Sequence, residues 1–138
     1  MEKETKEVTP PPTQEFNYTL RVTQKFDSAH KLNDYVGACA NLHGHTWKFE
    51  VFVLVPKLKD KVEFGIDFKV MKATIEKFVT SKLDHNYLND VVKQPTAENL
   101  SVYIFTTLDS VFKKKFGAKV VRVDLWETEN ACITLTSK

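Results

Sequence analysis

In residues 43–55, HGHTWKFEVFVLV, every odd position carries a histidine or an apolar side chain. Side chains two apart in a β-strand point to the same face, so this pattern predicts a long strand with one buried face. His43 and His45 open that face, and Gly44 leaves the opposite face clear between them. The stretch therefore predicts a strand that brings two imidazoles to one place. Its apolar odd positions are Trp47, Phe49, Val51, Val53 and Val55.

Three further stretches also alternate with period two and predict strands. Residues 16–26 predict a first strand antiparallel to 43–55, with His30 just beyond its end, where it would meet the two histidines. Residues 121–125 and 133–135 predict a terminal hairpin that turns at residues 129–130. The side chains expected to face the core from these strands are Phe16, Tyr18, Leu20, Val22, Val121, Val123, Leu125, Ile133 and Leu135.

Two helices are expected between the strands. The first begins at residue 67 or 68 and ends within 80–83, and the second begins after Thr96 as N-cap and ends at Gly117. The element order ββααββ predicts an α+β domain: a four-stranded antiparallel sheet with both helices on one face. The helical side chains expected to face inward are Met71, Ile75, Phe78, Val79, Leu100, Ile104, Leu108, Val111 and Phe112.

Length and composition predict a single domain. The chain has 138 residues, 42% of them hydrophobic, which suffices for one buried core over residues 16–138. Residues 1–15 are charged and then proline-rich, which predicts a flexible N-terminal tail. The 20 basic and 18 acidic residues nearly balance, so neither a nucleic acid nor a membrane partner is expected. The charged start and the lack of a run of about 18 apolar residues predict a cytoplasmic protein.

Three of the four histidines lie around one thiol, since His30 and Cys39 precede His43 and His45 closely. Three neutral imidazoles with an open fourth position are typical of a catalytic Zn²⁺ site, whereas a structural zinc site has four protein ligands. The two cysteines are too few for a disulfide framework. Cys132 has no such neighbours and is expected to be a core or strand thiol.

The predicted sheet has two exposed edges, and we expect large apolar side chains on its second face. Such a sheet usually pairs with neighbours. This predicts a homo-oligomer in which sheets join edge to edge, so that residues from different chains meet at the boundary.

Six short motifs follow one another along this pattern, and together, over residues 16–136, they resemble the family of 6-pyruvoyltetrahydropterin and 6-carboxytetrahydropterin synthases. Each motif alone would occur by chance, but six in this order would not. They are Phe26-Asp27-Ser28-Ala29-His30, Cys39-x-x-x-His43-Gly44-His45, Asp67-Phe68, Leu83-Asp84-His85-Asn86-Tyr87-Leu88-Asn89, Pro95-Thr96-Ala97-Glu98-Asn99-Leu100 and Glu127-Thr128.

The resemblance implies a tunnelling fold, in which three subunits join their sheets into a barrel and two barrels stack as a hexamer, a dimer of trimers. It implies a pterin triphosphate substrate, 7,8-dihydroneopterin triphosphate, whose side-chain hydroxyls bind a Zn²⁺ ion. The matching zinc ligands are His30, His43 and His45. The metal would polarise oxygen and make the neighbouring C–H bond acidic.

The resemblance also implies roles for residues outside the metal site. Cys39 matches the catalytic base, and Asp84 with His85 matches a proton relay, although adjacent residues are not expected to hydrogen-bond as a serine-protease dyad does. Glu127 matches the glutamate that grips the amino-pyrimidine edge of the pterin, and it could also take part in the relay. Thr96 matches a residue with polar contacts to the pterin. Without the resemblance, Asp84 and His85 could be capping groups and Glu127 an exposed strand-end charge.

The reaction within the family is indicated by one spacing. Three residues separate Cys39 from His43, as in the 6-carboxytetrahydropterin synthases of queuosine biosynthesis, whereas the tetrahydrobiopterin-forming 6-pyruvoyl branch has two more. A side-chain-cleaving branch carries a glutamate near the cysteine, but residues 31–42 contain none. A non-catalytic zinc- and pterin-binding protein is a further alternative. No basic residue directly precedes Cys39, which departs from the pattern of many relatives.

Overall fold

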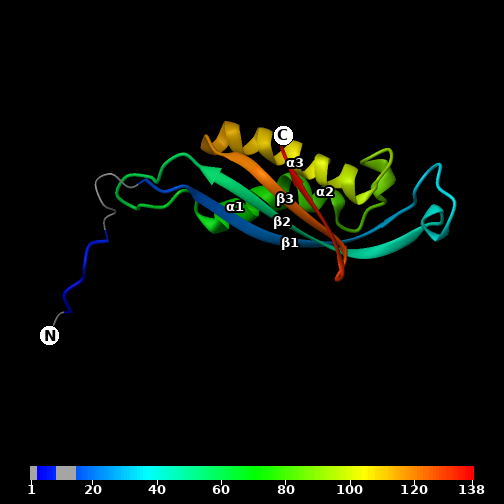
Figure 1. The fold of residues 1–138 in the computed structure, drawn as a ribbon, viewed down its shortest axis with the longest axis horizontal. Coiled ribbons are helices and arrows are strands. Elements are labelled where there is room, and N and C mark those ends of the chain that lie inside the picture. Colours follow the sequence, from blue (N-terminus) through cyan, green and yellow to red (C-terminus); the bar gives the residue numbers. More distant parts are fainter. Residues whose placement is uncertain (1–2, 9–14) are drawn as a thin grey trace.

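The computed structural model describes residues 3–8 and 15–138, and it shows one sheet with helices on one face (Figure 1). The sheet order is β1 (Tyr18–His30), β2 (His43–Val55), β3 (Lys119–Thr128), β4 (Ala131–Thr136), and each neighbouring pair is antiparallel. The predicted ββααββ order and four-stranded antiparallel sheet are confirmed. The predicted tail falls partly on residues 1–2 and 9–14, which lie outside the described residues, and it stays a prediction.

The long strand predicted over residues 43–55 is confirmed as β2, which pairs with β1 from Tyr18 opposite Val55 to His30 opposite His43. The predicted apolar face of β2, from Trp47 to Val55, is buried. One boundary differs, because His30 is the last residue of β1 and does not lie beyond it. Pairing with β2 continues to this residue, so the ladder itself places His30 directly across from His43.

The first predicted helix is confirmed, with an irregularity in its second half. α1 (Phe68–Ile75) begins after Asp67, whose carboxylate accepts the Lys69 backbone N–H at 2.8 Å. It continues through a π-helical turn, η2 (Glu76–Thr80), into the short α2 (Ser81–Leu83). In a π-helical turn the hydrogen bonds join residues five apart, which widens the helix locally. The helix therefore has the predicted extent without the predicted regularity.

The second predicted helix is confirmed with both of its caps. α3 (Ala97–Phe116) starts after Thr96, whose hydroxyl accepts the Asn99 N–H at 3.1 Å, and ends at Gly117 in the left-handed conformation, φ 61°. In the described part of the chain, no helix is both long and apolar enough to cross a membrane. Of the predicted inward residues of α3, Val111 is only half-buried, while Leu100, Ile104, Leu108 and Phe112 are buried.

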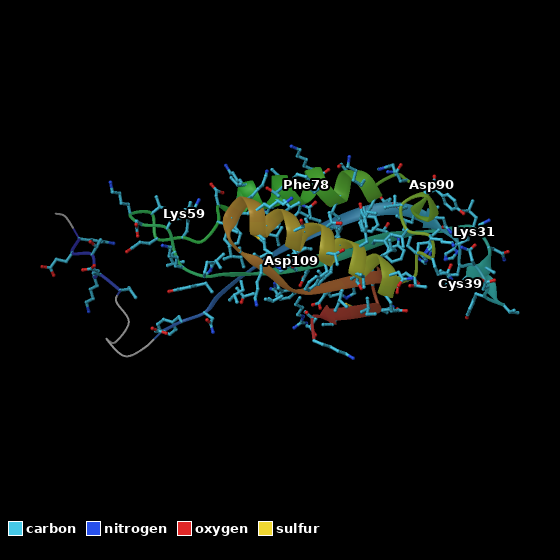
Figure 2. The ribbon with its side chains drawn as sticks, turned by 90° about the horizontal axis from the view of Figure 1, so that it is seen from above. Lys31, Cys39, Lys59, Phe78, Asp90 and Asp109 are labelled. Carbon is cyan, nitrogen blue, oxygen red and sulfur yellow. The ribbon has the colours of Figure 1, made fainter. Side chains whose placement is uncertain are left out.

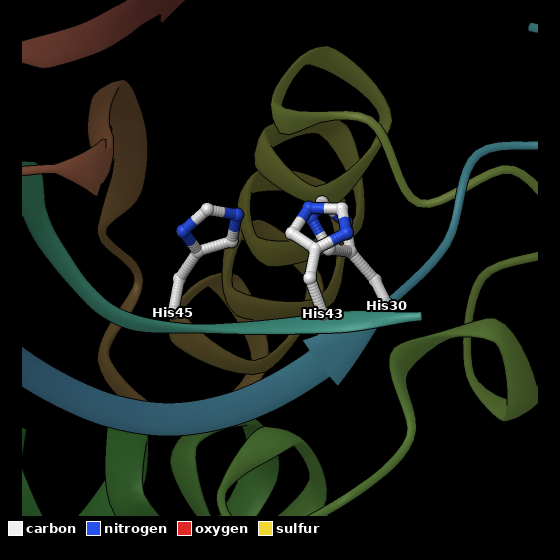
Figure 3. A group of neighbouring side chains, drawn as sticks. All are labelled: His30, His43 and His45. Carbon is white, nitrogen blue, oxygen red and sulfur yellow. The ribbon is translucent and has the colours of Figure 1, made fainter. Parts of the chain in front are cut away.

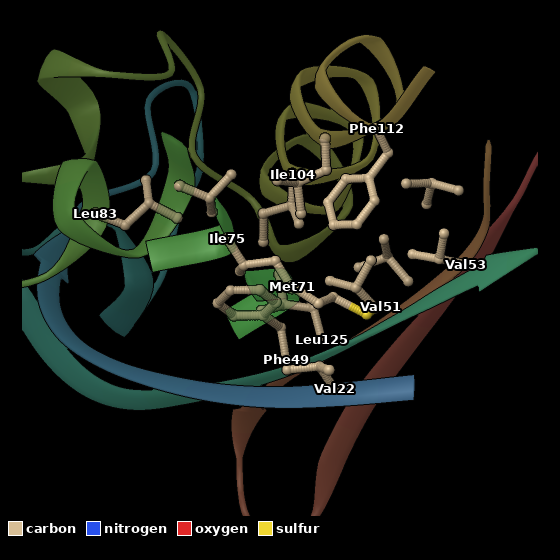
Figure 4. Close-up of a cluster of buried hydrophobic side chains, with 14 of the residues drawn as sticks. Val22, Phe49, Val51, Val53, Met71, Ile75, Leu83, Ile104, Phe112 and Leu125 are labelled. Carbon is tan, nitrogen blue, oxygen red and sulfur yellow. The ribbon is translucent and has the colours of Figure 1, made fainter. Parts of the chain in front are cut away.

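The core fills the space between the sheet and the helices (Figure 4). Three expected core residues are wrong. Phe16 and Tyr18, at the start of the first predicted strand, are 52% and 41% exposed. Val121 is half-buried, and Val120 is buried in its place. Phe52 pairs with Arg122 but Val53 pairs with Val120, which leaves Val121 as the extra residue of a β-bulge. A bulge interrupts the strict alternation of a strand. Val120 and Val123 are three positions apart in the sequence, yet both face the core.

The face of the sheet away from the helices carries the large apolar side chains Phe52, Leu54 and Trp126, together with polar groups. Cations lie over two of them: Arg122 over the Phe52 ring at 4.7 Å and Lys48 over the Trp126 ring at 4.1 Å. Asp124, 5% exposed, accepts two 2.9 Å hydrogen bonds from Arg122. This face therefore mixes apolar and charged side chains, and the oligomer stays a prediction.

Candidate metal centre and adjoining cavity

His30, His43 and His45 converge at one end of the sheet (Figure 3). The antiparallel pairing sets His30, at the end of β1, opposite His43, at the start of β2, and the two-residue period puts His45 on the same face. One nitrogen from each ring lies within 4.8 Å of the other two. The ring centroids are 4.6 to 5.2 Å apart. The three candidate ligands from the sequence are therefore brought together.

Two backbone carbonyls fix which nitrogens of this cluster are free. The Nδ1–H of His30 donates to the Pro95 carbonyl at 2.8 Å, and the Nδ1–H of His43 donates to the Asn41 carbonyl at 2.7 Å. In a neutral imidazole, donation from Nδ1 places the lone pair on Nε2, the atom that can bind a metal. Metal-binding histidines are usually held by a second hydrogen bond of this kind. No sequence pattern marks either carbonyl.

Two buried nitrogens of the cluster have no hydrogen-bond partner. Such atoms indicate whether the residues suit a metal. Among the described residues, Nε2 of His30 and Nε2 of His45 are buried and have no hydrogen-bond partner. Such atoms are costly unless something binds them. Burial lowers the pKa of His45, which favours the neutral, ligating form of its imidazole. A three-imidazole donor set of this kind suits Zn²⁺.

Trp47 packs against the back of this cluster. Its ring meets His30 and His45 edge-on, with centroids 5.1 and 5.4 Å apart, and it is fully buried. The strand pattern predicted Trp47 as a core residue only. Its ring occupies one side of two of the three imidazoles and restricts their rotation there.

Beside the histidines lies a cavity of about 300 Å³ whose lining includes Cys39, Thr96 and Glu127. Cys39 comes from the short helix η1 (Ala38–Ala40), Thr96 from the N-cap of α3 and Glu127 from β3. The Glu127 carboxylate oxygens lie 3.9 Å from His30 Nε2 and 3.8 Å from His45 Nε2. Three residues singled out separately in the sequence thus share one cavity at the histidine cluster. Figure 2 shows Cys39 with Lys31 at the end of the molecule opposite Lys59.

Asp84 and His85 lie in a different place, along the edge strand β1. The His85 N–H donates to the Asp27 carbonyl at 2.7 Å, and Asp84 accepts the Asp27 N–H at 2.9 Å. A second pocket, of about 490 Å³, is lined by His85 together with β1 residues. Among the described residues, no side chain or backbone group lines both this pocket and the cavity of Cys39.

The geometry of the Asp84–His85 pair corrects the sequence expectation. Nδ1 of His85 lies 2.9 Å from Oδ2 of Asp84, so the adjacent residues do form a direct contact. His85 has a left-handed backbone, φ 55°, which is uncommon for a residue with a Cβ. The hydrogen bond from the Asp27 backbone, followed by the one from His85, lowers the pKa of Asp84. The His85 ring remains 79% exposed and faces solvent in the single chain.

Cys132 lies on β4 and is exposed, which confirms a strand position and excludes a core one. Its thiol contacts the Ile133 carbonyl at 3.5 Å. Both cysteines line the cavity that holds Thr96 and Glu127, Cys39 from η1 and Cys132 from β4.

Comparison with known proteins shows which family the chain resembles. The family model described as 6-pyruvoyl tetrahydropterin synthase matches residues 19–138. A 6-carboxy-5,6,7,8-tetrahydropterin synthase of Synechocystis is 37% identical over 89 residues, 61% of this chain and 69% of that protein. A dihydroneopterin monophosphate aldolase of Pyrococcus furiosus is 33% identical over 103 residues, 74% of this chain and 82% of that protein.

The solved structures agree on the fold. The Caenorhabditis elegans 6-pyruvoyl tetrahydropterin synthase superposes with a TM-score of 0.76 at 22% identity, over 88% of this chain and 96% of that one. At this identity the likeness speaks for the fold alone, and the expected tunnelling-fold architecture is confirmed. With the family match covering almost all of the described domain, the chain belongs to the 6-pyruvoyl tetrahydropterin synthase family.

Proposed function

We propose that this protein is a zinc-dependent 6-carboxy-5,6,7,8-tetrahydropterin synthase, a lyase that acts on 7,8-dihydroneopterin triphosphate in the cytoplasm. The observation that carries the proposal is the convergence of His30, His43 and His45, with two of their Nδ1 atoms held by carbonyls, beside the cavity that contains Cys39 and Glu127. The product is inferred from the loop of three residues between Cys39 and His43 and from the name of the Synechocystis relative.

In this proposal the three imidazoles hold the metal through their Nε2 atoms. Zinc bound there would polarise a side-chain oxygen of the substrate and make the adjacent C–H bond more acidic. The backbone carbonyls of Pro95 and Asn41 keep the His30 and His43 rings in the binding tautomer. The packing of Trp47 against His30 and His45 limits the positions that the metal can take.

The cavity next to the histidines fits one end of a pterin. The Glu127 carboxylate can accept two parallel N–H bonds from the amino-pyrimidine edge. The Thr96 oxygen accepts the Asn99 N–H, which leaves its own hydroxyl proton free to donate to a ring nitrogen or carbonyl. With the ring held at these two groups, the C6 side chain would extend toward the histidines.

Cys39 is the proposed base for the carbon proton, because it lines the same cavity. The Asp84–His85 pair is proposed to complete the site from a neighbouring subunit. The pair lies at the β1 edge, whereas the hairpin that borders the Cys39 cavity belongs to the opposite edge strand, β4. Joining sheets edge to edge in a trimer, and stacking two trimers as a hexamer, would bring the two pockets together.

Two alternatives remain in the same class of chemistry. A 6-pyruvoyltetrahydropterin synthase would use the same residues but only eliminate triphosphate. An aldolase, as the Pyrococcus furiosus relative is named, would cleave the side chain. A zinc- and pterin-binding protein without turnover is disfavoured because a binder has no use for Cys39 and His85.

The decisive experiment incubates the zinc-loaded protein with 7,8-dihydroneopterin triphosphate and identifies the products by mass spectrometry. We expect a 6-carboxy pterin together with acetaldehyde and triphosphate. A 6-pyruvoyl product would assign the biopterin branch, and a 6-hydroxymethyl pterin would assign the cleavage branch. Tight pterin binding with no product would refute the enzyme proposal for this substrate.

Sharing of the site between subunits predicts complementation. Cys39→Ala and His85→Ala variants should each be inactive alone, but mixed hexamers refolded from equal amounts should regain activity. If each site takes Cys39 from one subunit and His85 from the next, about one quarter of the sites carry both intact residues. The measurement is turnover of the mixture against each parent. If oligomers that are shown to contain both variants regain no activity, Cys39 and His85 act from the same chain.

A further inference from the structure

Glu127 lies close to two histidines of the candidate metal site. Its Oε2 lies 3.9 Å from Nε2 of His30, and its Oε1 lies 3.8 Å from Nε2 of His45. These two nitrogens are the buried atoms of the cluster without hydrogen-bond partners. The carboxylate therefore faces two of the three imidazoles, and each of its oxygens faces a different ring.

These distances do not describe hydrogen bonds. An N–H···O hydrogen bond has its heavy atoms 2.7 to 3.2 Å apart, and both separations exceed this range clearly. Among the described residues, no lysine or arginine pairs with Glu127, whose side chain is 32% exposed. The carboxylate is thus held near two imidazole nitrogens without a proton-mediated contact to either one.

The separations resemble those between two ligands of one ion. With zinc–nitrogen and zinc–oxygen bonds of about 2.0 to 2.1 Å, neighbouring ligand atoms of a tetrahedral site lie roughly 3.3 Å apart. The distances from Glu127 to His30 and His45 exceed this value by about half an ångström, a shift that rotation of a partly exposed side chain can supply. A carboxylate also offsets part of the charge that three neutral imidazoles leave on Zn²⁺.

From this geometry we propose that Glu127 is the fourth metal ligand in the absence of substrate and that it leaves the metal when the pterin ring binds. The inference rests on the zinc centre of the proposed function and deepens the role of Glu127 within it. A forked contact to the amino-pyrimidine edge needs both carboxylate oxygens, so Glu127 cannot hold the ring and the metal at once. Binding of the ring would therefore open a coordination position for the side chain of the substrate.

The first test measures Zn²⁺ affinity without any pterin, by competition with a chromophoric chelator. We expect Glu127→Ala and Glu127→Gln to weaken binding by about 10- to 100-fold, as large as the losses seen when residues that support metal ligands are removed. Glu98→Gln is the matched control, because Glu98 lines the same cavity and carries the same charge but has no contact with the histidines. It should keep the wild-type affinity within about twofold.

The second test reads the coordination directly. In the cobalt(II)-loaded protein, the visible absorption bands of Glu127→Ala should differ from those of the wild type, whereas those of Glu98→Gln should not. Unsubstituted pterin, which lacks the side-chain hydroxyls, should shift the wild-type bands in the same direction as the Glu127→Ala substitution does. A spectrum that pterin leaves unchanged while it binds would overturn the exchange.

Two results would overturn ligation by Glu127. One is an unchanged Zn²⁺ affinity in Glu127→Ala that is shown to be folded by circular dichroism. The other is an equal loss of affinity in Glu98→Gln with unchanged cobalt bands, which would indicate a general charge effect. Neither result concerns turnover, so product formation by the wild type would leave the proposed function intact. Conversely, ligation without any product would leave the inference intact and refute the function.

Discussion

Replacing His45 by alanine should leave the protein folded but unable to retain zinc, with kcat/KM reduced by about 10³-fold or more. The substitution removes one of three imidazoles and leaves two, too few for a stable zinc site. Polarisation by a metal is worth several kcal/mol, and each 1.4 kcal/mol is a factor of ten in rate. The side chain is 18% exposed and lies at the start of β2, away from the main core, so the fold should persist. Metal content per subunit and turnover are the two measurements.

The fourth histidine supplies the matched control for this prediction. His85→Ala makes the same chemical change at a side chain that is 79% exposed and lies in the other pocket. It should retain a full complement of zinc while losing activity. Equal zinc content in both variants would contradict the assignment of the metal to His30, His43 and His45.

Replacing Cys39 by alanine should reduce turnover by about 10² to 10⁴-fold, the usual contribution of a positioned acid or base. Zinc content should stay at the wild-type level, because the Cys39 thiol is not among the groups that converge with the histidines. Binding of a pterin should also persist, since Glu127 and Thr96 remain. The combination of intact binding with lost turnover separates a base from a ligand or a packing residue.

Cys132→Ala is the control for Cys39, because it removes the other thiol that lines this cavity, one that lies on β4 and contacts the Ile133 carbonyl. Its turnover should equal that of the wild type. An active Cys39→Ala variant would show that the proton is taken by another group, and the Asp84–His85 pair of a neighbouring subunit would be the next candidate.

Several sequence expectations failed where two segments meet. Val121 does not face the core because a β-bulge shifts the register of β3 on β2 by one residue. The bulge is a property of the pairing and not of either strand alone. Asp84 and His85 were expected to remain apart, but a left-handed backbone at His85 brings ring and carboxylate together. On the second face of the sheet, cations of one strand lie over aromatic rings of the next, an arrangement that neither strand reveals by itself.

The sequence by itself determined the elements and the metal-ligand candidates. Alternation over residues 43–55 set the face of β2, and antiparallel pairing then required His30 to approach His43. Both follow from the local period of a strand, which residue type reveals directly. The motifs also sufficed to identify the family.

Only the tertiary structure decided how the histidines are held and what faces them. The carbonyls of Pro95 and Asn41 fix two tautomers, yet a carbonyl is present at every residue, so no sequence pattern marks those two. Glu127 reaches the cluster from 82 residues beyond His45, through the register of β3 on β2. The sheet order likewise places Cys39 and His85 in separate pockets. Such contacts depend on the path of the backbone in space, which local patterns of side chains do not encode.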